Sequence, residues 1–105
     1  DVCSSDLNAN VSEMFLEVNK NNSENKVAMV GVDATSKQQE AVKNGEELGI
    51  LSQNPYAMGY QTMWAAIQST APKKEVTIDK KVLLDPAWID AENLESEDYA
   101  NYLYN

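Results

Sequence analysis

Histidine and arginine are both absent from this chain of 105 residues, and cysteine occurs once. Without histidine the chain has no Ser-His-Asp triad, no histidine general base and no histidine-ligated zinc or haem. A single cysteine excludes an internal disulfide and a cysteine-cluster metal site. Within these residues we therefore expect no enzyme active site, no metal site and no cofactor.

Positive charge is also scarce, because the chain has eight lysines and 17 acidic residues, which gives a net charge of -9. Phosphate contacts need clustered cations, and base readout favours the arginine fork, so nucleic acid is excluded as a partner. Anionic membrane surfaces are disfavoured for the same reason. No apolar run approaches the about 20 residues of a membrane span, so we expect no direct membrane insertion.

The first seven residues, DVCSSDL, are expected to be non-native. This string resembles one reading frame through the end of a common short-read sequencing adapter; the alternative is a genuine N-terminal tail. If residues 1–7 are such a scar, the native part begins at Asn8, and the loss of Asp1 and Asp6 changes the net charge to -7. Such segments are set aside before the fold is considered.

Two short, β-branched, continuously apolar runs predict strands. Residues 26–32 (KVAMVGV) and 48–52 (LGILS) have the pattern of strands that are buried on both faces of a parallel sheet. Right-handed crossovers would place the two strands side by side. The weakly alternating segment 75–84 is expected to be extended.

Helices are expected between these strands. The first begins at Asn10 as its cap, the second covers 36–43 behind Thr35 or Ser36, and the third covers 55–70 behind an Asn-Pro start. The acidic, aromatic tail 85–105 is expected to be docked and partly helical, since a disordered tail would carry fewer aromatics. The alternation of helices and strands predicts an α/β fold with a parallel sheet.

Three polar residues are candidates for a binding site. Asp33 follows the first strand, Gln53 follows the second, and Asn10 precedes the first helix. Ligands of open parallel sheets bind beyond the carboxyl ends of the strands. A carboxylate with two amides suits a neutral, polyhydroxylated ligand, whereas a phosphate would need glycine-rich turns and cations. The alternatives are helix capping by Asp33 and Asn10 and a hydrogen-bonded turn amide for Gln53.

Three motifs, taken together, resemble a known family. They are VGVD at 30–33, the helix end KNG at 43–45, and QNPYAMGY at 53–60. This combination is similar to the C-terminal third of the type I sugar-binding proteins of bacterial ABC importers, the group that contains the ribose- and galactose-binding proteins. The resemblance covers about residues 8–84. It implies two α/β lobes that are joined by three crossing strands and close like a hinge around the ligand.

The resemblance also implies how the chain is divided and which residues contact the ligand. Residues 8–53 would be part of the C-terminal lobe, 54–82 would belong to the N-terminal lobe, and 83–105 would return to the C-terminal lobe and end in the acidic aromatic tail. The fold would then be an incomplete parallel-sheet periplasmic-binding-protein-like fold with parts of two lobes. The matching ligand-binding positions are Asp33, Gln53 and Asn10. The motif around Asn10 departs from the family, which usually has an acid at the position of Val11 and a glycine at that of Leu16.

By this resemblance the function is extracytoplasmic binding of a sugar or sugar-like solute, in the periplasm or at the cell surface on a lipid anchor. The expected partners are a monosaccharide or related polyol and the permease of an ABC transporter. The alternative is the effector-binding domain of a transcriptional regulator of the lactose-repressor family, which uses the same two-lobed fold. The acidic tail with Trp88 and the QNPY sequence favour the transport protein.

Overall fold

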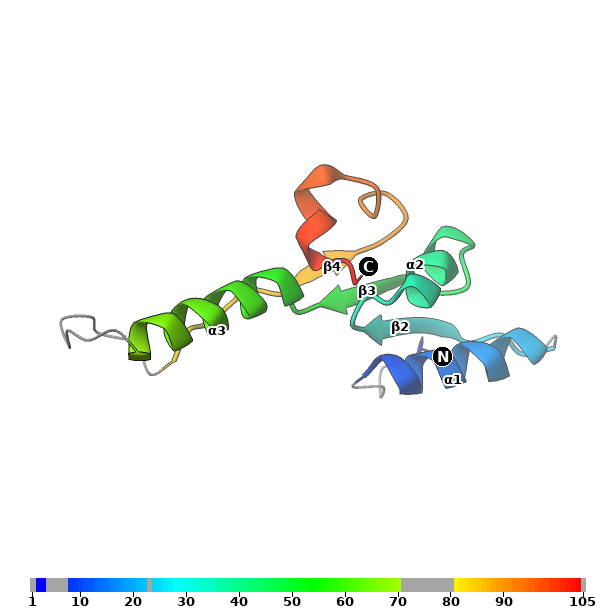
Figure 1. The fold of residues 1–105 in the computed structure, drawn as a ribbon. Coiled ribbons are helices and arrows are strands. Elements are labelled where there is room, and N and C mark those ends of the chain that lie inside the picture. The colour runs from blue at the N-terminus through cyan, green and yellow to red at the C-terminus, as the bar shows by residue number, and fades with distance from the viewer. Residues whose placement is uncertain (1, 4–7, 23, 71–80, 105) are drawn as a thin grey trace.

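The computed structural model describes residues 2–3, 8–22, 24–70 and 81–104. They form a small α/β structure in which helices alternate with the strands of a mixed sheet (Figure 1). The sheet order is β1-β2-β3-β4, formed by Val2–Cys3, Ala28–Val32, Gly49–Ser52 and Ala87–Ile89. The helices are α1 (Ala9–Asn21), α2 (Ser36–Lys43), α3 (Pro55–Thr70) and the 3-10 helix η1 (Glu97–Tyr102).

The central part of the sheet follows the sequence prediction. The two predicted strands form β2 and β3, which are parallel neighbours, and β1 extends the parallel order on the other side of β2. The strand β4 was not predicted, and it pairs with β3 in the antiparallel direction. The sheet is therefore mixed rather than wholly parallel. Two residues of the segment expected to be non-native lie in β1, and the origin of that segment stays a prediction.

The helices α2 and α3 confirm the predicted ranges 36–43 and 55–70. The expectation that Asn10 caps the first helix was wrong, because α1 begins at Ala9 and Asn8 is its cap. Asn8 Oδ1 accepts a hydrogen bond from the Val11 amide at 3.2 Å. The earlier start also lets the Ala9 amide donate to Asp33, which is a contact across 24 residues that no local pattern encodes.

The segment 75–84 was expected to be extended. Residues 75–80 lie outside the described part of the chain, and residues 81–86 have no regular secondary structure. The tail is docked and partly helical, as expected. Its residues Tyr99, Tyr102, Leu103 and Tyr104 pack against the hydrophobic core formed by Ala34, Val42, Ile50, Ile89 and Leu94.

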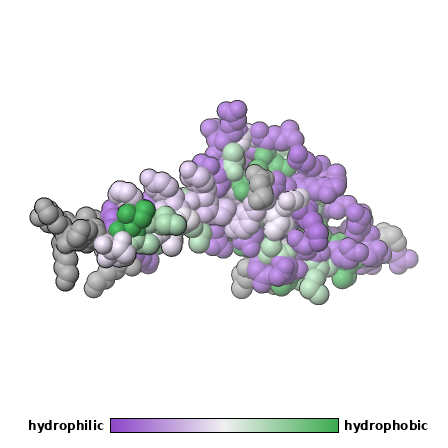
Figure 2. All heavy atoms as spheres, viewed as in Figure 1, coloured by the Kyte–Doolittle hydropathy of each residue, from purple (hydrophilic) through white to green (hydrophobic). Residues whose placement is uncertain are grey.

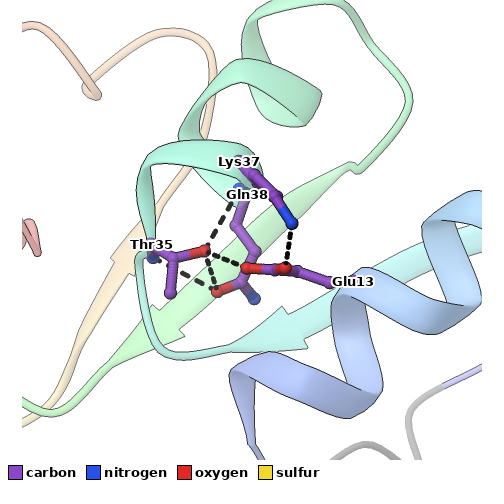
Figure 3. A network of polar contacts seen from close by, with 4 residues as sticks. All are labelled: Glu13, Thr35, Lys37 and Gln38. Atoms are coloured by element: carbon purple, nitrogen blue, oxygen red, sulfur yellow. Dashed lines mark hydrogen bonds and ion pairs between the residues drawn. The ribbon is translucent and has the colours of Figure 1, made fainter.

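The start of α2 is fixed by a capping box. The Thr35 hydroxyl accepts a hydrogen bond from the Gln38 amide at 3.4 Å, and Gln38 Oε1 accepts from the Thr35 amide at 3.2 Å. Glu13 of α1 reaches the same place (Figure 3): its Oε1 lies 3.1 Å from the Thr35 hydroxyl, and its Oε2 is 2.7 Å from Lys37 Nζ. Lys37 lowers the pKa of Glu13, but an ion pair this exposed contributes little to stability.

Replacing Thr35 by alanine is expected to lower the free energy of unfolding by about 1 kcal/mol, because the side-chain half of the capping box is lost. Urea denaturation followed by circular dichroism measures the change. Ser36→Ala is the matched control, since Ser36 is exposed and lies inside the helix. Equal losses for the two variants would contradict the assignment of the cap to Thr35.

The sheet has one covered face and one open face. The strand register places Gly31, Ile50 and Ile89 side by side, and both isoleucines are fully buried. A side chain at Gly31 would meet the carboxylate of Glu47, the Gln38 amide and the Ser12 hydroxyl, so α1 and α2 both lie over this face.

On the other face, Leu51 and Trp88 lie side by side and remain 40% and 43% exposed. The prediction that the two strands are buried on both faces is therefore wrong within the described residues. The described α1 and α2 pack over the opposite face, together with the aromatic side chains of the tail.

The helix α3 projects away from the sheet (Figure 1), and none of its residues is buried. This projection gives the molecule a long dimension of 64 Å against 26 and 19 Å in the other two directions. The helix has no charged residue, and its large apolar side chains are exposed: Tyr56, Met58, Tyr60, Met63, Trp64 and Ile67. Figure 2 shows pale and green side chains along this projection and mostly purple ones over the body of the molecule.

Candidate functional site

The candidate site lies where β2 and β3 end. Val32 pairs with Leu51, and the Asp33 amide donates to the Leu51 carbonyl at 3.0 Å. Asp33 and Gln53 therefore follow neighbouring strands at one edge of the sheet, as the sequence predicts. Asp33 is half-buried there, whereas Gln53 is exposed.

Both strands end in left-handed backbone. Asp33 has φ 75° and Asn54 has φ 55°, and they are the two non-glycine residues with positive φ in the described part of the chain. Aspartate and asparagine are among the few side-chain-bearing residues that tolerate this conformation. Asn54 also caps α3, as expected, because its Oδ1 accepts from the Ala57 amide at 3.0 Å. Asp33 directly follows β2, whereas Asn54 comes two residues after the end of β3.

The Asp33 carboxylate is held through both of its oxygens. Oδ2 accepts from the Ala9 amide at 3.2 Å, at the N-terminus of α1, where the helix dipole favours a negative charge. Oδ1 accepts from the Tyr104 hydroxyl at 3.0 Å. These two bonds use two of the about four acceptor positions of a carboxylate, one on each oxygen.

Tyr104 is a site residue that the sequence reasoning missed. Its position is fixed by the backbone of the tail: the Tyr104 amide donates to the Ala34 carbonyl at 3.0 Å, and Gln39 Nε2 donates to the Tyr104 carbonyl at 3.3 Å. Burial raises the pKa of Tyr104, and the hydrogen bond to Asp33 and the charge of that residue raise it further. The phenol is thus a neutral donor at ordinary pH. The signal in the sequence was only the abundance of aromatics in the tail.

The other two predicted ligand-binding residues lie nearby but are not bonded to Asp33 in the described contacts. Asn10 is an exposed residue in the first turn of α1, directly after the Ala9 amide that bonds Asp33. Gln53 lies in the turn between β3 and α3. Asp33 accepts from the first amide of α1, but the cap of α1 is Asn8 and the helix that follows Asp33 is capped by Thr35. The Asp33 carboxylate is half-buried rather than sealed.

A hollow lies beside Tyr104, between the start of α3 and η1. Its volume is about 520 Å³, it is wide open to solvent, and Asp33, Gln53 and Asn10 are not among its lining residues. Two aromatic residues, Tyr56 and Tyr104, line it together with Pro55, Ala100, Asn101 and Leu103. Pockets of several hundred Å³ accommodate small organic ligands, and aromatic rings provide an apolar body with a polar tip.

Among the described residues there is no cluster of three or more acidic, histidine or cysteine side chains that could hold a metal ion. No helix in the described ranges is both long and apolar enough to cross a membrane. The chain matches no protein-family model, no curated protein and no solved structure.

Proposed function

We propose that this chain is part of a two-lobed extracytoplasmic binding protein that takes a monosaccharide or related polyol and delivers it to an ABC importer. The observation that carries the proposal is the Asp33 carboxylate, which is half-buried at the carboxyl edge of β2 and β3 and held by the Ala9 amide and the Tyr104 hydroxyl. A carboxylate accepts hydrogen bonds, so it complements the hydroxyl donors of a neutral sugar.

Charge also favours a neutral ligand. Asp33 and a net charge of -9 would repel phosphates and carboxylates, whereas a sugar brings hydroxyl donors and no charge. In this role no bond is made or broken. Gln53 and Asn10 would complete the polar set, because their amides can both donate to and accept from sugar hydroxyls.

The form of α3 supports the division into two lobes. A helix that is apolar on several sides and uncharged is typical of the interior of a larger structure. In this chain α3 stands away from the sheet with no buried residue, and residues 53–54 and 81–86 connect it to the body. Residues 54–82 would then pack within the N-terminal lobe, and the open face with Leu51 and Trp88 would be covered in the intact C-terminal lobe.

The proposal is tested on the protein expressed from its complete coding sequence. Calorimetric titration with a panel of pentoses, hexoses and their polyols is expected to reveal at least one sugar that binds. Asp33→Asn is the matched variant, and its titration with that sugar should show no heat of binding. Absence of binding across the panel would contradict the proposal, and a helix-turn-helix encoded ahead of these residues would favour the regulator instead.

A further inference from the structure

We propose that Tyr104 is a positioning residue of the ligand site: its hydroxyl orients the Asp33 carboxylate so that the two carboxylate oxygens accept hydroxyls from neighbouring carbons of the ligand. The proposal rests on the proposed function and names the group it recognises, a vicinal diol. It assigns a role in binding to the last residues of the tail.

The first step is the orientation of the carboxylate. A carboxylate with one hydrogen bond can rotate about its χ2 torsion, which is broad in aspartate. Asp33 is held on opposite oxygens by two donors, the Ala9 amide at 3.2 Å and the Tyr104 hydroxyl at 3.0 Å. Because each donor takes one position, each oxygen has about one acceptor position left. Two such positions, one on each oxygen of the carboxylate, match two hydroxyls on adjacent carbons.

The second step is the anchoring of Tyr104 itself. Its segment is bonded to three places along the chain: the loop after β2 through the Ala34 carbonyl, α2 through Gln39, and β3 through Ser52. The Ser52 hydroxyl donates to the Tyr102 carbonyl at 2.5 Å. A tail held at three points keeps the phenol in one place, so the orientation of Asp33 is set before a ligand arrives, which lowers the entropic cost of binding.

The third step is the protonation state. Tyr104 can hold Asp33 in this way only as a neutral phenol, because a phenolate would have no proton to donate. Its pKa is raised by burial and by Asp33, which keeps the donor in place. A neutral phenol adds no second negative charge beside the Asp33 carboxylate, which accepts from hydroxyl donors.

The test uses the protein from its complete coding sequence, with calorimetric titration of the pentoses and hexoses that bind wild type and of their monodeoxy analogues, one for each hydroxyl. Tyr104→Phe is expected to weaken binding of the parent sugar by about tenfold, in line with one lost hydrogen bond to a charged group. It should also shrink the preference for the parent sugar over its deoxy analogue. The control is Tyr102→Phe, which removes a 3.5 Å bond to the Asp85 carbonyl, away from Asp33.

The outcomes separate this proposal from the proposed function. If sugar binds wild type and is lost in Asp33→Asn, but Tyr104→Phe changes nothing, the role of Tyr104 is overturned and the function stands. Equal weakening of the parent and deoxy sugars would indicate general loosening and would also overturn it. No binding of any pentose, hexose or polyol of the panel to wild type overturns both.

The hydrogen bond between Tyr104 and Asp33 can also be tested without a ligand. Ultraviolet titration of the tyrosines is expected to show one phenol that titrates above its usual range, and this phenol should be missing in Tyr104→Phe. Asp33→Asn should lower its pKa, because a neighbouring negative charge is removed while burial remains. An unchanged tyrosine titration in Asp33→Asn would overturn the proposal.

Discussion

Replacing Asp33 by alanine is expected to cost on the order of 2–4 kcal/mol of sugar affinity, because buried sugar hydroxyls lose a charged acceptor. At about 1.4 kcal/mol per factor of ten, this is roughly a 30- to 1,000-fold increase in Kd. Isothermal calorimetry with the sugar that binds wild type measures the change.

A second substitution at the same position separates the loss of the acceptor from backbone strain. Asp33 has φ 75°, which alanine tolerates poorly and asparagine tolerates well. Asp33→Asn keeps the shape and the left-handed backbone but removes the charge and one acceptor oxygen. It should therefore weaken binding with a smaller loss of stability than Asp33→Ala.

Asp98→Ala is the matched control for charge, because Asp98 is an exposed carboxylate on η1. It changes the net charge by the same amount and should leave the affinity unchanged. Unchanged affinity in both Asp33 variants would reject Asp33 as a ligand-binding residue, whatever the result for the control.

The elements that the sequence predicts well are those with local signals at their ends. The Thr35 capping box fixes the start of α2, and the Asn54-Pro55 pair fixes the start of α3. These signals act over three or four residues, so they can be read without the tertiary structure. The apolar runs of β2 and β3 identified the strands for the same reason.

The start of α1 was misplaced within a local signal, because Asn8 rather than Asn10 is the cap. The other missed features depend on contacts that are distant in the sequence. The strand β4 pairs with β3 after more than thirty intervening residues. Tyr104 reaches Asp33 across 71 positions. No periodicity or capping rule encodes such a contact, so the sequence pointed to Asp33 but not to its partner.

Ile50→Ala is expected to remove about 2–5 kcal/mol from the free energy of unfolding of the 105-residue chain. Ile50 is fully buried, and its neighbours across β2 and β4 are Gly31 and Ile89. Gly31 has no side chain with which to fill the space left by the missing atoms, so the cavity would persist.

Leu51→Ala is the matched control for this prediction, because Leu51 is the next residue on the same strand and points to the open face, where it is 40% exposed. The substitution removes a similar volume of apolar side chain, and in the 105-residue chain it should cost less than half as much. Urea denaturation followed by tryptophan fluorescence measures both variants. Equal losses would mean that both faces of the sheet are covered in the folded chain, which would contradict the open face on which the two-lobe proposal partly depends. A small domain has a total stability of only about 5–15 kcal/mol, so the loss at Ile50 would remove a large fraction of it, whereas Leu51→Ala should stay close to wild type.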